Sequence, residues 1–146
     1  MDSIDCAIIS ELKQNGRAST SEISKKVHLS VPAVAGRIRK MEQTGIISEY
    51  TVRINREKTG NKLLVFIFVN IDHTANIESF RKSITAFDCV LECHHVVGEY
   101  DYLLKVSVED TKDLEDFLSE KLKKIKGVAS SNTVVTLTSI KEKINV

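Results

Sequence analysis

The run LLVFIFVNID, residues 63–72, constrains the fold more than any other part of the 146-residue chain. Its apolar stretch is too short to cross a bilayer, which takes about 18 residues or more. β-Branched and aromatic side chains dominate it, as is typical of a β-strand. Alternate strand residues point to opposite faces, and here Leu63, Val65, Ile67 and Val69 on one face are as apolar as Leu64, Phe66 and Phe68 on the other. A face open to water alternates apolar with polar residues, so both faces of this strand must be covered.

The residues that follow this strand predict a helix, two strands and a second helix. The first helical face is marked by apolar residues three or four apart, Ile77, Phe80, Ile84 and Phe87. Strands are predicted at residues 89–97 and 102–108, joined by the turn GEYD. The second helix, with Thr111 as its cap, carries its own apolar face, Leu114, Phe117, Leu118, Leu122 and Ile125.

Gly127 ends the second helix, and a last strand is predicted at residues 128–140. The order over residues 63–140 is therefore β-α-β-β-α-β, the ferredoxin-like arrangement, with both helices on one face of a four-stranded antiparallel sheet. The second apolar face of the sheet then needs another cover. An identical subunit is the simplest one, so we expect a homo-oligomer.

The first 46 residues have helical periods instead. Ile4, Ile8 and Leu12 mark a helix that stops at Asn15-Gly16, and Ser19 with Glu22 forms a capping box that opens a second helix. A third helix begins with Ser30 as its N-cap and Pro32 in its first turn, and it ends before Gly45. We therefore predict an α+β protein with a three-helix domain at 1–46, an extended linker strand and loop at 47–62, the ferredoxin-like domain at 63–140 and a tail at 141–146.

The third helix carries two different faces. On a helical wheel Val34, Ile38 and Met41 form a buried stripe. The opposite side consists of small and basic residues, with Pro32, Gly36 and Arg39 at its centre and Ala33 and Lys40 beside them. Small residues allow close approach to the major groove of DNA, and Arg and Lys reach phosphates or guanine edges. The pattern therefore predicts a helix-turn-helix whose second helix reads DNA.

A helical hairpin with a solvated basic face is the alternative interpretation of the same spacing. Charge favours DNA over this alternative, because the segment from Lys13 to Lys40 holds seven basic residues and one acidic residue, Glu22.

Three runs of the sequence together resemble the Lrp/AsnC, or feast/famine, family of transcription factors. They are RASTSEISKKVHLSVPAVAGRIRKMEQTGIISEYTVRIN, then LLVFIFV, then ECHHVVGEYDYLLKV. The resemblance implies a helix-turn-helix domain on a ferredoxin-like domain that pairs into dimers and often into octamers. It also implies a regulator of amino-acid metabolism genes whose C-terminal domain senses an amino acid. Where the family usually has Gly in the turn this sequence has His28, a residue type that tolerates a positive φ.

The resemblance places the DNA-binding motif at residues 20–39 and the recognition helix at residues 30–39. The candidate DNA-binding residues are Thr20, Ser21, Ser30, Val31, Pro32, Ala33, Gly36, Arg37, Arg39 and Lys40. None of the three residues that begin the helix, Val31, Pro32 and Ala33, can make the bidentate hydrogen bonds that discriminate bases. We therefore expect selectivity to come largely from the bending or wrapping of DNA.

The segment Gly98 to Tyr102 lies between two predicted strands. Its Gly and Asp are ordinary turn residues, and turn chemistry alone accounts for them. The resemblance implies in addition an effector pocket for an amino acid at the contact between dimers. The candidates it supplies are Gly98, Tyr100 and Asp101, with Thr133 and Val135 from the last strand.

Cys89, Cys93, His94 and His95 do not form a metal site on this pattern. Four strand residues span roughly 13 Å at about 3.3 Å each, too far for two sulfurs on one zinc or for a disulfide. No metal or other cofactor is predicted. A small metabolic enzyme or a ligand-binding protein on a ferredoxin-like fold, without DNA binding, is the alternative function. The sequence holds no phosphate-binding glycine loop, nucleophile elbow or H-E-x-x-H motif that would favour it.

The remaining features concern location and partners. The N-terminus lacks the cationic and small-residue regions of a signal peptide, and three cysteines without close spacing suit reduced thiols. We expect a cytoplasmic, nucleoid-associated protein whose partners are double-stranded DNA, other copies of itself and an amino acid, with no membrane.

Overall fold

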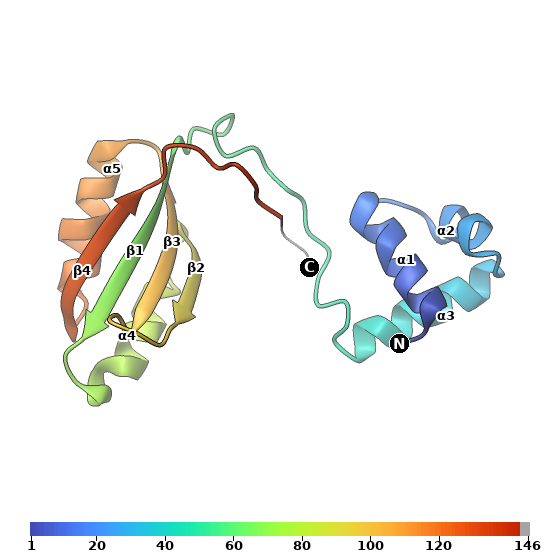
Figure 1. Ribbon diagram of the computed structural model, residues 1–146, viewed down its shortest axis with the longest axis horizontal. Helices are drawn as coiled ribbons and strands as arrows, with labels where there is room; N and C mark the ends of the chain where they lie inside the picture. The colour runs from blue at the N-terminus through green and yellow to red at the C-terminus, as the bar shows by residue number, and fades with distance from the viewer. Residues whose placement is uncertain (144–146) are drawn as a thin grey trace. The chain divides into compact units, whose positions relative to one another are not determined.

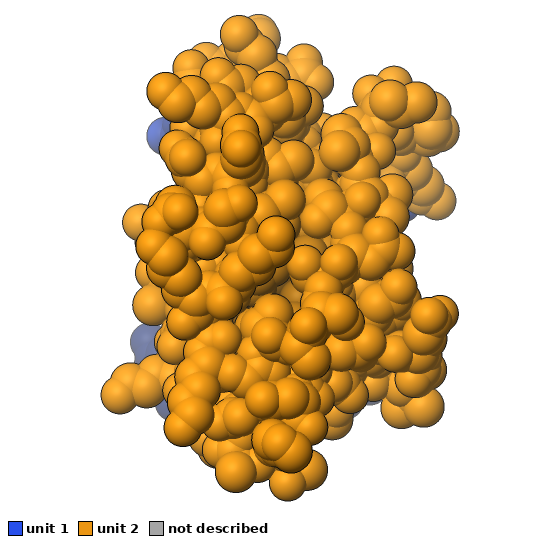
Figure 2. Space-filling model, turned by 90° about the vertical axis from the view of Figure 1, so that its left-hand side faces the viewer, with its two compact units in different colours: residues 1–53, 143–146 blue, residues 54–142 orange. Residues whose placement is uncertain are grey.

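The computed structural model describes residues 1–143, which form two compact units, one of residues 1–53 with residue 143 and the other of residues 54–142 (Figures 1 and 2). Among these residues no helix is long and apolar enough to span a membrane.

The first unit consists of three helices, α1 (Ser3–Gln14), α2 (Thr20–Val27) and α3 (Val31–Gln43). All three start at a capping residue whose side chain accepts from a backbone N–H: Asp2 for α1, and the two predicted caps, Ser19 for α2 and Ser30 for α3. The helices enclose a small core of Ile8, Ile23, Val34 and Met41, each at most 2% exposed. Ile38 packs against this core but is only partly buried.

The second unit is a four-stranded antiparallel sheet with helices on one face. Its strands are β1 (Leu63–Ile71), β2 (Val90–His95), β3 (Tyr102–Val108) and β4 (Val128–Val135), in the order β2-β3-β1-β4. The helical segments that precede β2 and β4 are α4 (Ile77–Ile84) and α5 (Thr111–Asp116), and α5 continues through the turns η2 (Phe117–Lys121) and η3 (Leu122–Lys124). The predicted ferredoxin-like topology is confirmed.

The helices cover the face of β1 that carries Val65, Ile67 and Val69. These three side chains are fully buried, and Phe80 of α4 and Phe117 with Leu122 from the α5 side complete the core. The opposite face, which we call the free face, carries Leu64, Phe66 and Phe68 of β1. It is not wholly bare, because Leu64 is only 3% exposed.

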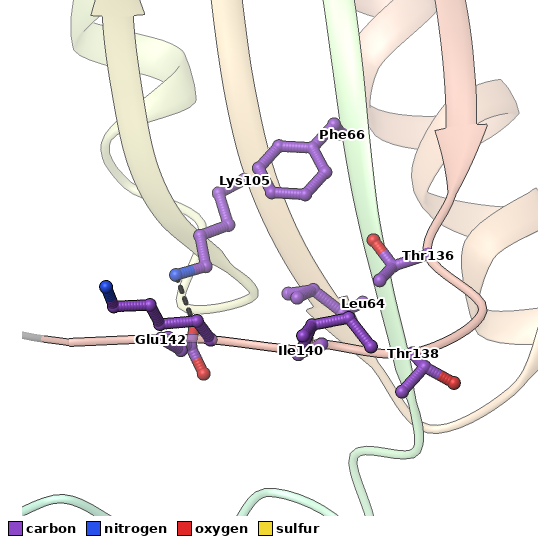
Figure 3. A pocket seen from close by; sticks show the side chains of 9 residues that line it. Leu64, Phe66, Lys105, Thr136, Thr138, Ile140 and Glu142 are labelled. Carbon is purple, nitrogen blue, oxygen red and sulfur yellow. Dashed lines mark hydrogen bonds and ion pairs between the residues drawn. The ribbon is translucent and has the colours of Figure 1, made fainter.

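The chain after β4 supplies this partial cover. The last hydrogen bond of the strand runs from the Thr136 N–H to the Leu64 carbonyl, and β1 begins only one residue earlier, so the chain leaves the sheet there. The predicted strand at 128–140 was therefore too long. Residues 136–142 instead lie beside Leu64 and Phe66, and Glu142 pairs with Lys105 of β3 at 2.6 Å (Figure 3).

Two further expectations differ from the structure. The cap of α5 is Asp110, whose carboxylate accepts from the N–H groups of Lys112 and Asp113, while Thr111 is the first helical residue. The linker at 47–62, expected to hold an extended strand, joins no sheet ladder within the described chain. Its apolar residues Tyr50, Val52 and Ile54 alternate and are more than half exposed.

Gly127, the residue before β4, lies very close to Asn76, the residue before α4. Its φ is +96°, and a Cβ built on it would lie 2.3 Å from the Asn76 Cβ, which is too close for two carbon atoms. We expect Gly127→Ala to lower the free energy of unfolding of the second unit by about 2–4 kcal/mol in denaturant titration. Gly60→Ala is the matched control, since Gly60 has φ +103° but open space around it, and it should cost only about 1–2 kcal/mol. Equal losses in the two variants would contradict the close approach.

Candidate nucleic-acid interface

The turn between α2 and α3 holds the two helices in a helix-turn-helix. His28 ends α2 in the left-handed conformation, with φ 53° and ψ 42°, and is the single non-glycine residue with positive φ in the described chain. The Leu29 N–H donates to the Ser24 carbonyl at 3.1 Å, which closes the helix end. His28, which stands where the family usually has glycine, thus adopts the positive φ expected of this position.

Paired hydrogen bonds between side chain and backbone fix the start of α2. The Glu22 N–H donates to Ser19 Oγ at 3.2 Å, and the Ser19 N–H donates to Glu22 Oε2 at 2.7 Å. These backbone and side-chain bonds from Ser19 hold the pKa of Glu22 below its ordinary value. Thr20 and Ser21 follow in the first turn, with Ser21 exposed and Thr20 half-buried.

The outward face of α3 is open along its length. Pro32, Ala33, Gly36, Arg39 and Lys40 are exposed, and Val31 is 40% exposed. Apart from its chain neighbours and the nearby backbone of α3, no atom of the described chain lies within 4 Å of a Cβ built on Gly36, so this glycine keeps the surface low and fills no tight contact. Ser30, also exposed, accepts from the Ala33 N–H at 3.4 Å and sets the start of the helix. Small residues and two exposed cations thus share one face, as the sequence predicted.

Arg37 lies at the edge of this face, where it lines a groove with Ala33, Gly36 and Lys40. Its Nη1 is 2.7 Å from Asp2 Oδ2 and 2.7 Å from Asp5 Oδ1, at the start of α1. The hydrogen bonds that it donates to Asp2 and Asp5 raise the pKa of the guanidinium. Sequence reasoning missed these two aspartates, because thirty or more residues separate them from Arg37. The one signal that could have found them is the position of Arg37 on the wheel, beside the buried stripe rather than opposite it.

The predicted effector residues lie on two sides of the sheet. Tyr100 packs on Phe68 with ring centroids 5.1 Å apart, and the Asn132 side-chain amide donates to its hydroxyl at 3.4 Å, so Tyr100 belongs to the free face. Thr133 and Val135 pair with Ile67 and Val65 of β1, whose side chains face the helices. Directly paired residues share a face, so one chain does not bring Tyr100 together with Thr133 and Val135.

Asp101 has a structural task in this region. Its Oδ2 accepts from the Ile71 N–H at 2.7 Å, and its own N–H donates to the Val69 carbonyl at 3.1 Å. It thereby ties the turn before β3 to the end of β1. Gly98 in the same turn is exposed and has φ +148°, a backbone conformation that residues other than glycine avoid.

The cysteine and histidine cluster divides between the two faces of β2. Cys93 pairs with Leu104 and His95 stacks on Tyr102, both on the helix side, while His94 contacts Glu92 on the free face at 3.0 Å. Within residues 1–143 no three His, Cys, Asp or Glu side chains are grouped as metal ligands would be.

Comparison with known proteins assigns both units. Residues 1–42 match the AsnC-type helix-turn-helix domain, and residues 64–146 match the Lrp/AsnC ligand binding domain. The chain belongs to the Lrp/AsnC family. It is 35% identical over 144 residues to the leucine-responsive regulatory protein of Escherichia coli, covering 97% of this chain and 88% of that protein.

Solved structures agree with this assignment. A transcriptional regulator of Neisseria meningitidis in complex with L-Met superimposes with a TM-score of 0.96 at 29% identity, covering 100% of this chain and 96% of that one. LrpC of Bacillus subtilis gives a TM-score of 0.88 at 31% identity, over 98% and 99% of the two chains. These relatives are regulators, so an Lrp/AsnC transcriptional regulator replaces the alternative of a small metabolic enzyme.

The ion pairs of Arg37 predict how acid affects the first unit. Backbone hydrogen bonds within the α1 cap, followed by those from Arg37, lower the pKa of Asp2 and Asp5 below the ordinary value. A carboxylate with a lowered pKa stabilises the fold above its unfolded pKa of about 3.9, and this stability is lost as the pH falls through the folded pKa. We expect the melting temperature of the wild type to fall below about pH 4. In Asp2→Asn/Asp5→Asn this fall should be smaller; an identical acid profile would contradict the assignment.

Proposed function

We propose that this Lrp/AsnC regulator binds double-stranded DNA through α3, works as a homo-oligomer and controls genes of amino-acid metabolism as a cytoplasmic, nucleoid-associated protein. The observation that carries the proposal is the outward face of α3, where Pro32, Ala33 and Gly36 are small and exposed and Arg39 and Lys40 are free of ion pairs within residues 1–143. A helix with such a face fits the major groove closely.

Each candidate residue has a task in this arrangement. Val31, Pro32 and Ala33 begin the helix and meet base edges, where they offer at most apolar contacts to thymine methyl groups. Arg39 and Lys40 contact phosphates. Hydroxyl groups at helix starts donate to phosphates beside the groove, and these residues are Thr20, Ser21 and Ser30.

A reader with so few base-specific groups favours deformable DNA. An oligomer that engages several sites on one DNA gains affinity without new base contacts, provided that the DNA curves to reach them. Bending or wrapping of DNA is therefore part of the proposal.

The test compares three DNAs: a short duplex with one site, a long fragment with A-tracts in phase with the helical turn, and a straight fragment of equal length. The phased fragment should bind much more tightly than the straight one, while single-base changes in the short duplex should have small effects. Equal affinity for the two long fragments, or strong discrimination in the short duplex, would reject the bending proposal. Absence of salt-dependent binding to all three would reject DNA binding itself.

The assembly part of the proposal rests on apolar surface that one chain leaves uncovered. On the free face Phe66 and Phe68 are only half-buried, and Val134 of β4 is 49% exposed. The exposed alternation of Tyr50, Val52 and Ile54 adds an unpaired extended segment. Apolar area of this kind is typical of an interface between subunits, and we propose a homodimer that assembles further to an octamer.

A charge on the free face should break this assembly. Phe66→Asp would place a carboxylate at the centre of the buried patch, so light scattering should shift to a smaller species while circular dichroism remains that of a folded protein. Ser119→Asp is the control, because Ser119 is exposed on the helix side of the sheet, and its mass should equal that of the wild type. A wild type that is a monomer at micromolar concentration would refute the assembly.

We propose finally that an amino acid modulates the regulator. The solved relative that contains L-Met supports an amino-acid effector as a class. Gly98 and Tyr100 offer main-chain groups for its α-amino and α-carboxyl groups, and Asp101, whose own main-chain groups bond to Val69 and Val96, holds the turn that presents them. Because Thr133 and Val135 lie on the other side of the sheet, any part they play would come from a neighbouring subunit.

A further inference from the structure

The three charged groups Asp2, Asp5 and Arg37 form one connected network at the start of α1. In each carboxylate one oxygen belongs to the helix cap and the other to Arg37. Asp2 Oδ1 accepts from the Asp5 N–H at 2.9 Å, and Asp5 Oδ2 accepts from the Asp2 N–H at 3.0 Å. The remaining oxygens both accept from Arg37 Nη1. We call this network the Arg37 clamp.

The clamp connects α3 directly to the first turn of α1. On a wheel of about 100° per residue Arg37 lies about 60° from Val34 at the core, whereas Arg39 lies about 140° from it. The Arg37 side chain is 31% exposed and that of Asp5 is 17% exposed, so the contact is partly shielded from water. Arg37 thus occupies the seam between two helices, and Arg39 occupies the outward face.

Electrostatic repulsion disfavours a contact between Arg37 and a DNA phosphate. Met1, Asp2, Asp5 and the clamped Arg37 line the same surface groove as Ala33, Gly36 and Lys40, so both carboxylates lie beside the outward face of α3. While Arg37 is clamped, it compensates one of their two negative charges. An Arg37 that turned to a phosphate would leave both carboxylates uncompensated next to a polyanion, where like charges repel.

We propose that Arg37 is a positioning residue that fixes the reading helix against α1 and makes no contact with DNA. This inference deepens the proposed DNA binding and rests on it. The phosphate contacts are left to Arg39 and Lys40, and the orientation of α3 depends on two aspartates that the N-terminal turn already uses as its cap.

The first measurement is thermal melting without DNA, which is independent of the proposed function. Asn keeps a cap-accepting oxygen but loses the charge, so Asp2→Asn/Asp5→Asn removes the clamp and spares most of the cap. Arg37→Met and the double Asn variant should each lower the melting temperature. The triple variant should melt no lower than the less stable of these two, because all three remove the same contact. Additive losses would show that no clamp exists in solution and would overturn the proposal.

The second measurement is the salt dependence of DNA binding at a temperature where every variant is folded. Each phosphate contact contributes about one unit to the slope of log K against log salt. Arg39→Ala should make the slope shallower by about one unit. The triple variant, which removes Arg37 together with its acidic neighbours, should keep the wild-type slope but bind several-fold more weakly, because the reading helix is no longer fixed.

The following results distinguish a positioning role of Arg37 from a phosphate contact. A slope in the triple variant as shallow as that of Arg39→Ala would assign Arg37 to a phosphate, and an unchanged affinity would reduce the clamp to a contribution to stability; either result overturns the proposal. Arg37→Lys, which retains a cation for the carboxylates, should recover part of the affinity lost in Arg37→Met. Failure of the wild type to bind DNA would refute the proposed function, while melting would still decide whether the clamp forms.

Discussion

The second unit depends on the burial of both faces of β1. A strand that is apolar on both faces needs a cover on each of them. In this sheet β1 is a central strand, between β3 and β4. Its Val65, Ile67 and Val69 face α4 and α5 and form the centre of the core. The same strand leaves Phe66 and Phe68 on the face without helices. The apolar pattern that builds the core on one face therefore leaves apolar surface uncovered on the other.

The first unit faces a different constraint, because a reading helix must expose one side and still be held firmly. Its hydrophobic core is small, with four fully buried apolar side chains. Polar contacts fix the ends of the helices as well. Capping boxes begin α1 and α2, a serine caps α3, and His28 adopts the left-handed conformation between α2 and α3. The Arg37 clamp extends this use of cap groups from one helix to a contact between two. A short domain thus gains order without covering the surface that its function requires.

Local signals were sufficient to predict most of the elements. Ser19 with Glu22 and Ser30 with Pro32 placed α2 and α3 correctly, because capping chemistry depends on neighbours in the sequence. The cap of α5 was misplaced by one residue, since Asp110 and Thr111 both have suitable side chains and only the backbone conformation decides between them. The end of β4 was also missed, because β4 ends where its antiparallel partner β1 begins, and that partner is distant in the sequence.

The candidate site shows the same division. The outward face of α3 followed from helical geometry, whereas the ion pairs of Arg37 with Asp2 and Asp5 required the packing of α1 on α3. Thr133 and Tyr100 could not be assigned to opposite faces before the register of β4 on β1 was known.

Lys105 explains how a charged residue can lie in the middle of the free face. Its side chain is 15% exposed, and its ammonium lies 3.0 Å from Glu92 and 2.6 Å from Glu142, which together raise its pKa (Figure 3). An unpaired ammonium would oppose the burial of this face, because the desolvation of an ion without a counter-charge costs on the order of several kcal/mol. Because Lys105 is already paired with carboxylates, a second subunit that covers Phe66 meets an ammonium whose charge is compensated instead of an unpaired one. Glu142 comes from the segment after β4, so the C-terminal chain contributes the group that makes an apolar face with a lysine at its centre compatible with burial.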